Sequence, residues 1–177
     1  LAEGTPAEIQ NNEEVVEEIV RKCCKNRVPL ISIDKELEGG ACFAFDYADA
    51  FETLCNHVIK FHGAKNLYLI TGTEGNDYAE ERRAAYRRAL EKNGIAYDEG
   101  KVGYGDFWEG PTNDVMMRWF DIEKRDIPDA IICANDTMAI TVSNFLQKRG
   151  YRIPDECIVT GFDGIEQARI HFPTLST

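Results

Sequence analysis

The sequence lacks the features that mark membrane-spanning and secreted proteins. No apolar run in its 177 residues approaches the roughly 20 residues that cross a bilayer. The chain begins LAEGTPAEIQ, without a methionine and without a basic segment followed by an apolar one. We therefore expect a fragment or a trimmed start, no membrane partner, and little information about location from the missing signal peptide.

Positive charge is scarce. Lysine and arginine number 20 against 31 aspartates and glutamates, which gives a formal net charge of −11. A surface that binds nucleic-acid phosphates needs an excess of lysine and arginine. This segment is therefore not expected to bind nucleic acid itself, although a basic module elsewhere in a longer protein stays open.

Cysteine and histidine are present without the spacing of a metal site. The six cysteines form no C-x-x-C pair, and the three histidines have no ligand spacing with them. Three of the cysteines lie in apolar stretches, which favours free thiols of a reducing compartment over disulfides. We expect no metal, no cofactor and a cytoplasmic location.

Catalytic motifs are also missing. The sequence has no G-x-S-x-G motif and no glycine-rich phosphate loop, and ISIDKE lacks the second aspartate of the phosphatase D-x-D pattern. An enzyme could use Asp34 and Asp163 as a carboxylate pair or phosphoacceptor. Since no nucleophile–base constellation accompanies them, we expect the chain not to be an enzyme.

What the sequence does contain is a hydrophobic share of 44% in alternating strand-like and helix-like segments. Short apolar runs predict strands over 28–34, 41–46, 66–72, 95–105, 130–134 and 157–162. Apolar residues at helical spacing predict helices over 13–26, 49–61, 78–93, 112–124 and 136–149. Strands separated by helices of this length predict βαβ units, a mainly parallel sheet covered on both faces, and an α/β fold class.

Polar side chains follow the predicted strands. In parallel sheets, ligands bind outside the carboxyl ends of the strands. Carboxylates and amides accept bonds from hydroxyl groups, a guanidinium grips oxygens, and an aromatic ring stacks on a sugar face. The residues in question are Asp34, Arg82, Asp106, Phe107, Trp108, Asn135, Asp136 and Asp163. Their shared placement suits a small polyhydroxylated ligand.

Each of these residues also has a purely structural interpretation. Asn135 or Asp136 could cap the helix that follows, and Asp163 could start a short helix. Arg82 lies in a charged run that is typical of a solvated helix face. Phe107 and Trp108 are aromatic residues of a kind more often found in a core, so only one of them is expected to reach a ligand.

Three segments carry a resemblance to a known family: AIICANDTMAI, LQKRGYRIPDECIVTGFDGIEQARIHFPTLST and TGTEGNDYAEERRAAYRRALEKNGIAYD. Together they resemble the effector-binding core of LacI/GalR-type transcription regulators, of the periplasmic-binding-protein-like type I superfamily. The resemblance covers residues 28–177 and implies two α/β lobes with an effector in the cleft between them. It implies a partial N-terminal lobe over 1–104 and a C-terminal lobe over 105–177, without the final crossover.

The resemblance also implies roles for single residues. Asp34 matches an N-lobe ligand contact, Arg82 a residue that grips ligand oxygens, and Phe107 an aromatic platform. Asn135 and Asp163 match C-lobe residues that bind hydroxyls, facing Asp34 and Arg82 from the other lobe. The sequence departs from the family pattern at Glu80, Thr141 and Gly164, which affects the identity of the ligand more than the place of the site.

The function implied is that of a ligand-sensing domain that binds a sugar-like effector. It would control a DNA-binding headpiece that this chain does not contain, in a protein expected to be a homodimer. An alternative keeps the sensor and couples it to another signalling module, such as a diguanylate cyclase. A secreted solute-binding protein matches less closely.

Overall fold

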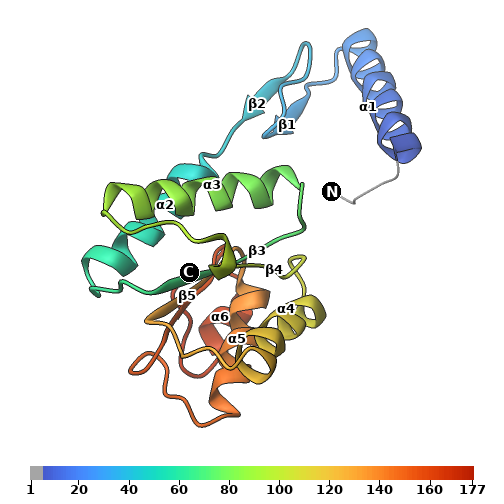
Figure 1. The fold of residues 1–177 in the computed structure, drawn as a ribbon. Helices are drawn as coiled ribbons and strands as arrows, with labels where there is room; N and C mark the ends of the chain where they lie inside the picture. The colour runs from blue at the N-terminus through green and yellow to red at the C-terminus, as the bar shows by residue number, and fades with distance from the viewer. Residues whose placement is uncertain (1–5) are drawn as a thin grey trace. The chain divides into compact units, whose positions relative to one another are not determined.

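The structure of the chain is a computed structural model that describes the backbone of residues 6–177 and the side chains of residues 14–177. The chain divides into two compact units (Figure 1). The first unit runs to Asp46, and the second unit comprises Tyr47–Thr177. No described helix is both long enough and apolar enough to cross a membrane.

The first unit consists of helix α1 (Pro6–Asn26) and the strands β1 (Ile31–Ile33) and β2 (Ala41–Phe43). The two strands pair in parallel, with Ser32 opposite Cys42. None of the side chains described in this unit, residues 14–46, is buried. A two-stranded sheet without layers on both faces has no core of its own.

The second unit is built on a four-stranded sheet in the order β4-β3-β5-β6, and all of its pairings are parallel. The strands are β3 (Leu67–Thr71), β4 (Val102–Tyr104), β5 (Ala130–Cys133) and β6 (Ile158–Thr160). Every residue of β3 and β5 is buried. The predicted α/β class with parallel strands is confirmed.

Helices cover both faces of this sheet, as Figure 1 shows. Leu67 and Leu69 of β3 pack with α2 (Tyr47–Lys60) and α3 (Asp77–Lys92), whereas Tyr68 and Ile70 point to the opposite face. There they pack with α4 (Glu109–Met116), the π-helical turn η2 (Met117–Ile122) and α5 (Asp136–Gln147). Alternate residues of a strand point to opposite faces, so the short strand β3 contributes side chains to the hydrophobic core on each face of the sheet.

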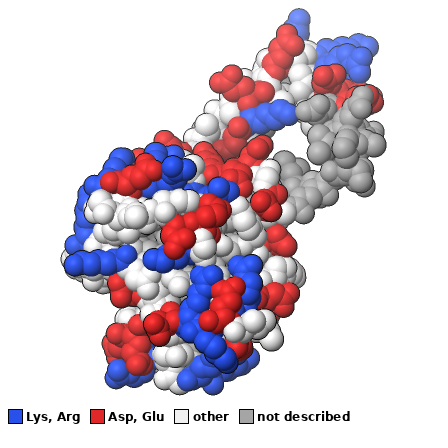
Figure 2. All heavy atoms as spheres, in the orientation of Figure 1, with Lys and Arg blue, Asp and Glu red and all other residues white. Residues whose placement is uncertain are grey.

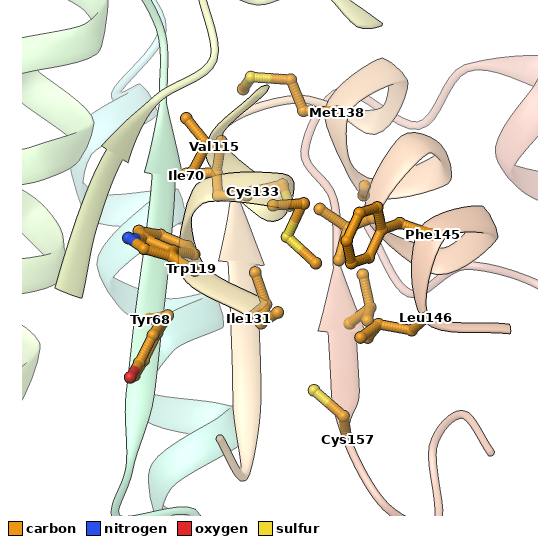
Figure 3. Close-up of a cluster of buried hydrophobic side chains, with 14 of the residues drawn as sticks. Tyr68, Ile70, Val115, Trp119, Ile131, Cys133, Met138, Phe145, Leu146 and Cys157 are labelled. Carbon is orange, nitrogen blue, oxygen red and sulfur yellow. The ribbon is translucent and has the colours of Figure 1, made fainter. Parts of the chain in front are cut away.

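Trp119 is the largest side chain in the second of these layers. It is fully buried, and its ring lies 5.0 Å from that of Tyr68 (Figure 3). A Cβ atom on Gly103 would come within 3.0 Å of the Trp119 ring and 2.4 Å of Val115. The glycine in β4 is therefore a requirement of this packing.

The remaining elements are the 3₁₀ turn η1 (Glu99–Lys101) and the short helix α6 (Glu166–Ile170). On the face of the second unit shown in Figure 2, lysines and arginines are interspersed with aspartates and glutamates.

The predicted division at residues 104 and 105 does not coincide with the compact units. It falls directly after β4, inside the four-stranded sheet, where β3 pairs with β4 on one side and with β5 on the other. Because hydrogen bonds of one sheet join segments on both sides of this point, the compact units divide the chain after Asp46 instead.

Candidate functional site

The candidate site lies at the carboxyl ends of the four parallel strands of the second unit. Arg82 follows β3 on helix α3, and Phe107 follows β4. Asn135 follows β5, and Asp163 follows β6. Parallel strands end at the same edge of a sheet, and the contacts described below join all four residues there.

Arg82 is a buried cation, with 8% of its surface exposed. Its guanidinium carbon lies 4.9 Å from the ring centre of Phe162, 5.6 Å from Phe107 and 6.0 Å from Tyr47. Its Nε has no hydrogen-bond partner among the described residues. Burial lowers the pKa of Arg82, and the charge of Asp163 opposes that shift. The guanidinium is thus held between aromatic rings with donor capacity left over.

Asp163 is the acidic partner of Arg82. Its Oδ1 lies 3.8 Å from Nη2 of Arg82, and its side chain is 45% exposed. Partial burial raises the pKa of Asp163, while the charge of Arg82 lowers it and that of Asp136 raises it. A separation of 3.8 Å is an ion pair longer than a direct hydrogen bond, so both groups keep capacity for a third molecule.

Phe107 is held in place by an unusual backbone. Both Asp106 (φ 50°) and Phe107 (φ 57°) adopt left-handed conformations, which non-glycine residues seldom do. The ring of Phe107 lies against Gly72, where a Cβ atom would come within 2.0 Å of it. Phe107 packs partly into the core, whereas the neighbouring Trp108 is 68% exposed.

Asn135 joins two of these segments. Its Oδ1 accepts from the backbone N–H of Met138 at 2.9 Å, and its Nδ2 donates to the carbonyl of Phe107 at 3.1 Å. The helix-capping interpretation is therefore confirmed for Asn135. One further N–H and one further lone pair of the amide remain for a ligand.

Two other capping interpretations are wrong. Asp136 is the first residue of α5 and not its N-cap, and its Oδ2 accepts from the backbone N–H of Ile165 at 2.8 Å. Asp163 does not start the following helix, because the N-cap of α6 is Ile165.

Arg82 also departs from two expectations. It is not part of a solvated helix face, since it is buried, while its neighbour Arg83 forms the surface network with Glu80 and Glu99. Nor does it face Asp163 from another unit, because both residues belong to the second unit and form an ion pair within it.

Asp34 belongs to the first unit, at the end of β1. It has a φ of 60°, and its Oδ1 accepts from the backbone N–H of Phe45 at 3.0 Å. The carboxylate therefore ties the residue after β1 to the segment that follows β2. Its predicted contact with a ligand stays a prediction.

Sequence reasoning missed the aromatic surroundings of Arg82. Tyr47 begins α2 and Phe162 precedes Asp163, and neither was expected to reach the site. Phe162 stands inside the GFDG segment that already pointed to Asp163, so its position beside a strand-end aspartate was the available signal. Within the described residues, no group of three or more histidine, cysteine, aspartate or glutamate side chains could hold a metal ion.

Comparison with known families adds to this geometry. A family model described as "Periplasmic binding protein-like domain" matches residues 57–177. A second model, for a branched-chain amino acid ATP-binding cassette transporter, matches only residues 1–17.

Curated relatives include HTH-type transcriptional repressors named PurR. The protein from Vibrio atlanticus is 39% identical over 115 residues, which are 65% of this chain and 34% of that protein. The protein from Vibrio campbellii is 34% identical over 116 residues, with 66% and 34% covered. The chain thus spans about a third of the length of these relatives.

Solved structures agree with the fold. A LacI-family sugar-binding transcriptional regulator from Escherichia coli, complexed with phosphate, has a TM-score of 0.73 and 26% identity over 90% of this chain and 57% of its own. A complex of the transcriptional regulator CelR with cellobiose has a TM-score of 0.71 and 25% identity, covering 84% of this chain and 46% of its own.

Proposed function

Because this chain belongs to the periplasmic binding protein-like family, as a fragment of a LacI/GalR-type effector-binding core, we propose that it is the ligand-sensing part of a transcription regulator. Its ligand is a small polyhydroxylated molecule of the sugar class, bound at the carboxyl edge of the sheet in the second unit. DNA binding belongs to a headpiece outside this chain, in a protein that acts as a homodimer.

The observation that carries this proposal is the Arg82–Asp163 pair beside aromatic rings. Two oxygens of a vicinal diol can share such a pair, because one hydroxyl donates to the carboxylate while its neighbour accepts from the guanidinium. Phe107 lies 5.6 Å from the same guanidinium and adds an apolar surface for the sugar ring. Asn135 contributes one free N–H and one free lone pair at the same edge.

The comparisons support two parts of this proposal: that the protein regulates transcription, and that its ligand is a sugar. The curated relatives are transcriptional repressors, and one structural neighbour, CelR, was solved as a complex with cellobiose. Ligand binding would control the headpiece by favouring one of two states of the regulator, which requires a different affinity for each state.

The test is a ligand screen on a protein that carries the complete effector-binding core around this chain. Cellobiose and a panel of mono- and disaccharides are screened by thermal shift, and the dissociation constant of the stabilising sugar is then measured for Arg82→Gln. We expect binding at least about tenfold weaker, since a charged hydrogen-bonding group is lost from a buried site.

Arg83→Gln is the matched control. Arg83 is the adjacent residue of the same helix, and it pairs with Glu80 and Glu99 at the surface. It should leave sugar affinity unchanged. Equal affinities of wild type and Arg82→Gln for the stabilising sugar would show that the site has been placed wrongly.

A further inference from the structure

Asp136 is a buried carboxylate for which the proposed function gives no role. It has no exposed surface, and its Oδ1 has no hydrogen-bond partner among the described residues. Burying a carboxylate is costly unless charge or hydrogen bonds offset the cost. Asp136 is the first residue of α5, where the positive end of the helix dipole provides part of that compensation. The rest of the desolvation cost must be offset by other contacts of the carboxylate or accepted for a functional role.

The contacts of Asp136 lead to the loop that carries Asp163. Its Oδ2 accepts from the backbone N–H of Ile165 at 2.8 Å. A Cβ atom on Gly161 would lie 2.0 Å from its Oδ1 and 3.0 Å from its Cα. The carboxylate therefore occupies the space that any side chain at position 161 would need, and it packs directly against the loop 161–165.

This loop needs restraint, because its backbone is strained. Asp163 has a φ of 118°, a region that L-residues rarely adopt, and Gly164 follows with a φ of 73°. Two other bonds hold it: the N–H of Gly161 donates to the carbonyl of Ser176 at 2.9 Å, and the N–H of Gly164 donates to Oγ1 of Thr177 at 3.0 Å. Of the side chains that accept from this loop, Asp136 is charged and Thr177 is not.

We infer that Asp136 is a positioning residue of the ligand site, which holds the loop 161–165 so that Asp163 faces Arg82 and which acts on Asp163 through its charge. Arg82 from α3 and Asp136 from α5 are the charged groups that act on Asp163, with opposite signs. The negative charge of Asp136 raises the pKa of Asp163 and so limits how completely Arg82 holds this carboxyl ionised. The inference rests on the proposed function, because it takes Asp163 as a ligand contact.

The experiment compares Asp136→Asn with Thr177→Val, which removes an uncharged acceptor from the same loop. The pKa of Asp163 is measured without ligand by NMR titration of its carboxyl carbon, together with the hydrogen-exchange rates of the Gly164 and Ile165 amides. We expect the pKa of Asp163 to fall in Asp136→Asn and to stay at its wild-type value in Thr177→Val. In Thr177→Val the exchange of Gly164 should accelerate roughly tenfold, as expected for the loss of one hydrogen bond.

A purely structural role predicts a different pattern. An unchanged pKa of Asp163 in Asp136→Asn, or equal shifts in both variants, would overturn the inference. Should Asp136→Asn fail to fold, Asp136→Ser removes the same charge with a smaller side chain, and the same fall is expected.

A second measurement separates this inference from the proposed function. With cellobiose or the sugar identified by thermal shift, the pH midpoint of the affinity should move in Asp136→Asn and not in Thr177→Val. If no sugar binds, the proposed function fails while the ligand-free titration still decides whether Asp136 acts on Asp163. If sugar binds and the titration of Asp163 is the same in wild type and in Asp136→Asn, the role of Asp136 is refuted and the binding site stands.

Discussion

Both units of this chain contain short parallel strands with apolar residues, yet they bury them to very different extents. In the second unit every residue of β3 and β5 is buried between two helical layers. In the first unit Ile31, Ile33 and Phe43 are 60% exposed or more. Apolar strands stabilise a fold only when layers on both faces remove them from water. Stability and the candidate site therefore reside together in the second unit.

The strongest test of this comparison separates the units. A chain of residues 47–177 should unfold cooperatively in urea with a free energy of unfolding close to that of the whole chain, because it contains both core layers. A peptide of residues 1–46 should show no cooperative transition, since a two-stranded sheet and one helix bury too little apolar surface. Circular dichroism during urea titration measures both. A cooperative transition of the peptide, or loss of one in residues 47–177, would contradict the comparison.

The same contrast explains what the sequence could predict. The periodicity that placed α2, α3 and α5 depends on local apolar spacing. Glycines with positive φ at positions 63, 94 and 150 follow these helices, a residue type that commonly ends a helix. The helix α3 begins at Asp77, and the residue before it, Asn76, is the N-cap, whose side chain accepts from the backbone N–H of Ala79. Helix boundaries of this kind depend on single hydrogen bonds that periodicity does not report.

The sequence predicts those parts of the site that follow from the positions of strand ends, and misses those that depend on contacts between distant segments. Strand ends fix where Asn135 and Asp163 lie, since the carboxyl ends of parallel strands share one edge. The burial of Arg82 among Tyr47, Phe107 and Phe162 arises from three segments distant in sequence. Which strands share a sheet decides such contacts, and local periodicity does not report that β3, β4 and β5 lie in one sheet.

The second prediction replaces one aromatic residue in each unit. Trp119→Ala should lower the free energy of unfolding by about 3–5 kcal/mol, because it leaves a cavity beside Tyr68 in the core. Phe43→Ala should change it by less than about 0.5 kcal/mol, since Phe43 is 60% exposed. Urea denaturation of both variants gives the values. Similar losses would mean that Phe43 is buried in the folded chain.

The third prediction compares acidic residues in ion pairs. In the second unit Glu52 is buried and pairs with Lys92 and with Arg88, the latter at 2.9 Å. Glu52→Gln should destabilise the chain by about 2 kcal/mol, as expected when hydrogen bonds between charged groups are weakened. In the first unit Glu18 pairs with Lys22 at the surface, and Glu18→Gln should produce no measurable change. Equal effects in urea denaturation would contradict the contrast.

The smallest expected effect concerns pH, and it distinguishes two carboxylates within the second unit. Hydrogen bonds from Lys92 and Arg88 lower the pKa of Glu52 in the folded chain, so wild type loses its advantage over Glu52→Gln as pH falls through that lowered pKa. Burial raises the pKa of Asp163. Its folded form then binds a proton before the unfolded chain does, so wild type gains stability relative to Asp163→Asn as pH falls through the raised pKa. Thermal unfolding of the three proteins between neutral and acidic pH should show differences of opposite sign, small for Asp163 because 45% of its side chain meets solvent. A loss of wild-type stability relative to both variants on acidification would mean that Arg82, and not burial, dominates the titration of Asp163.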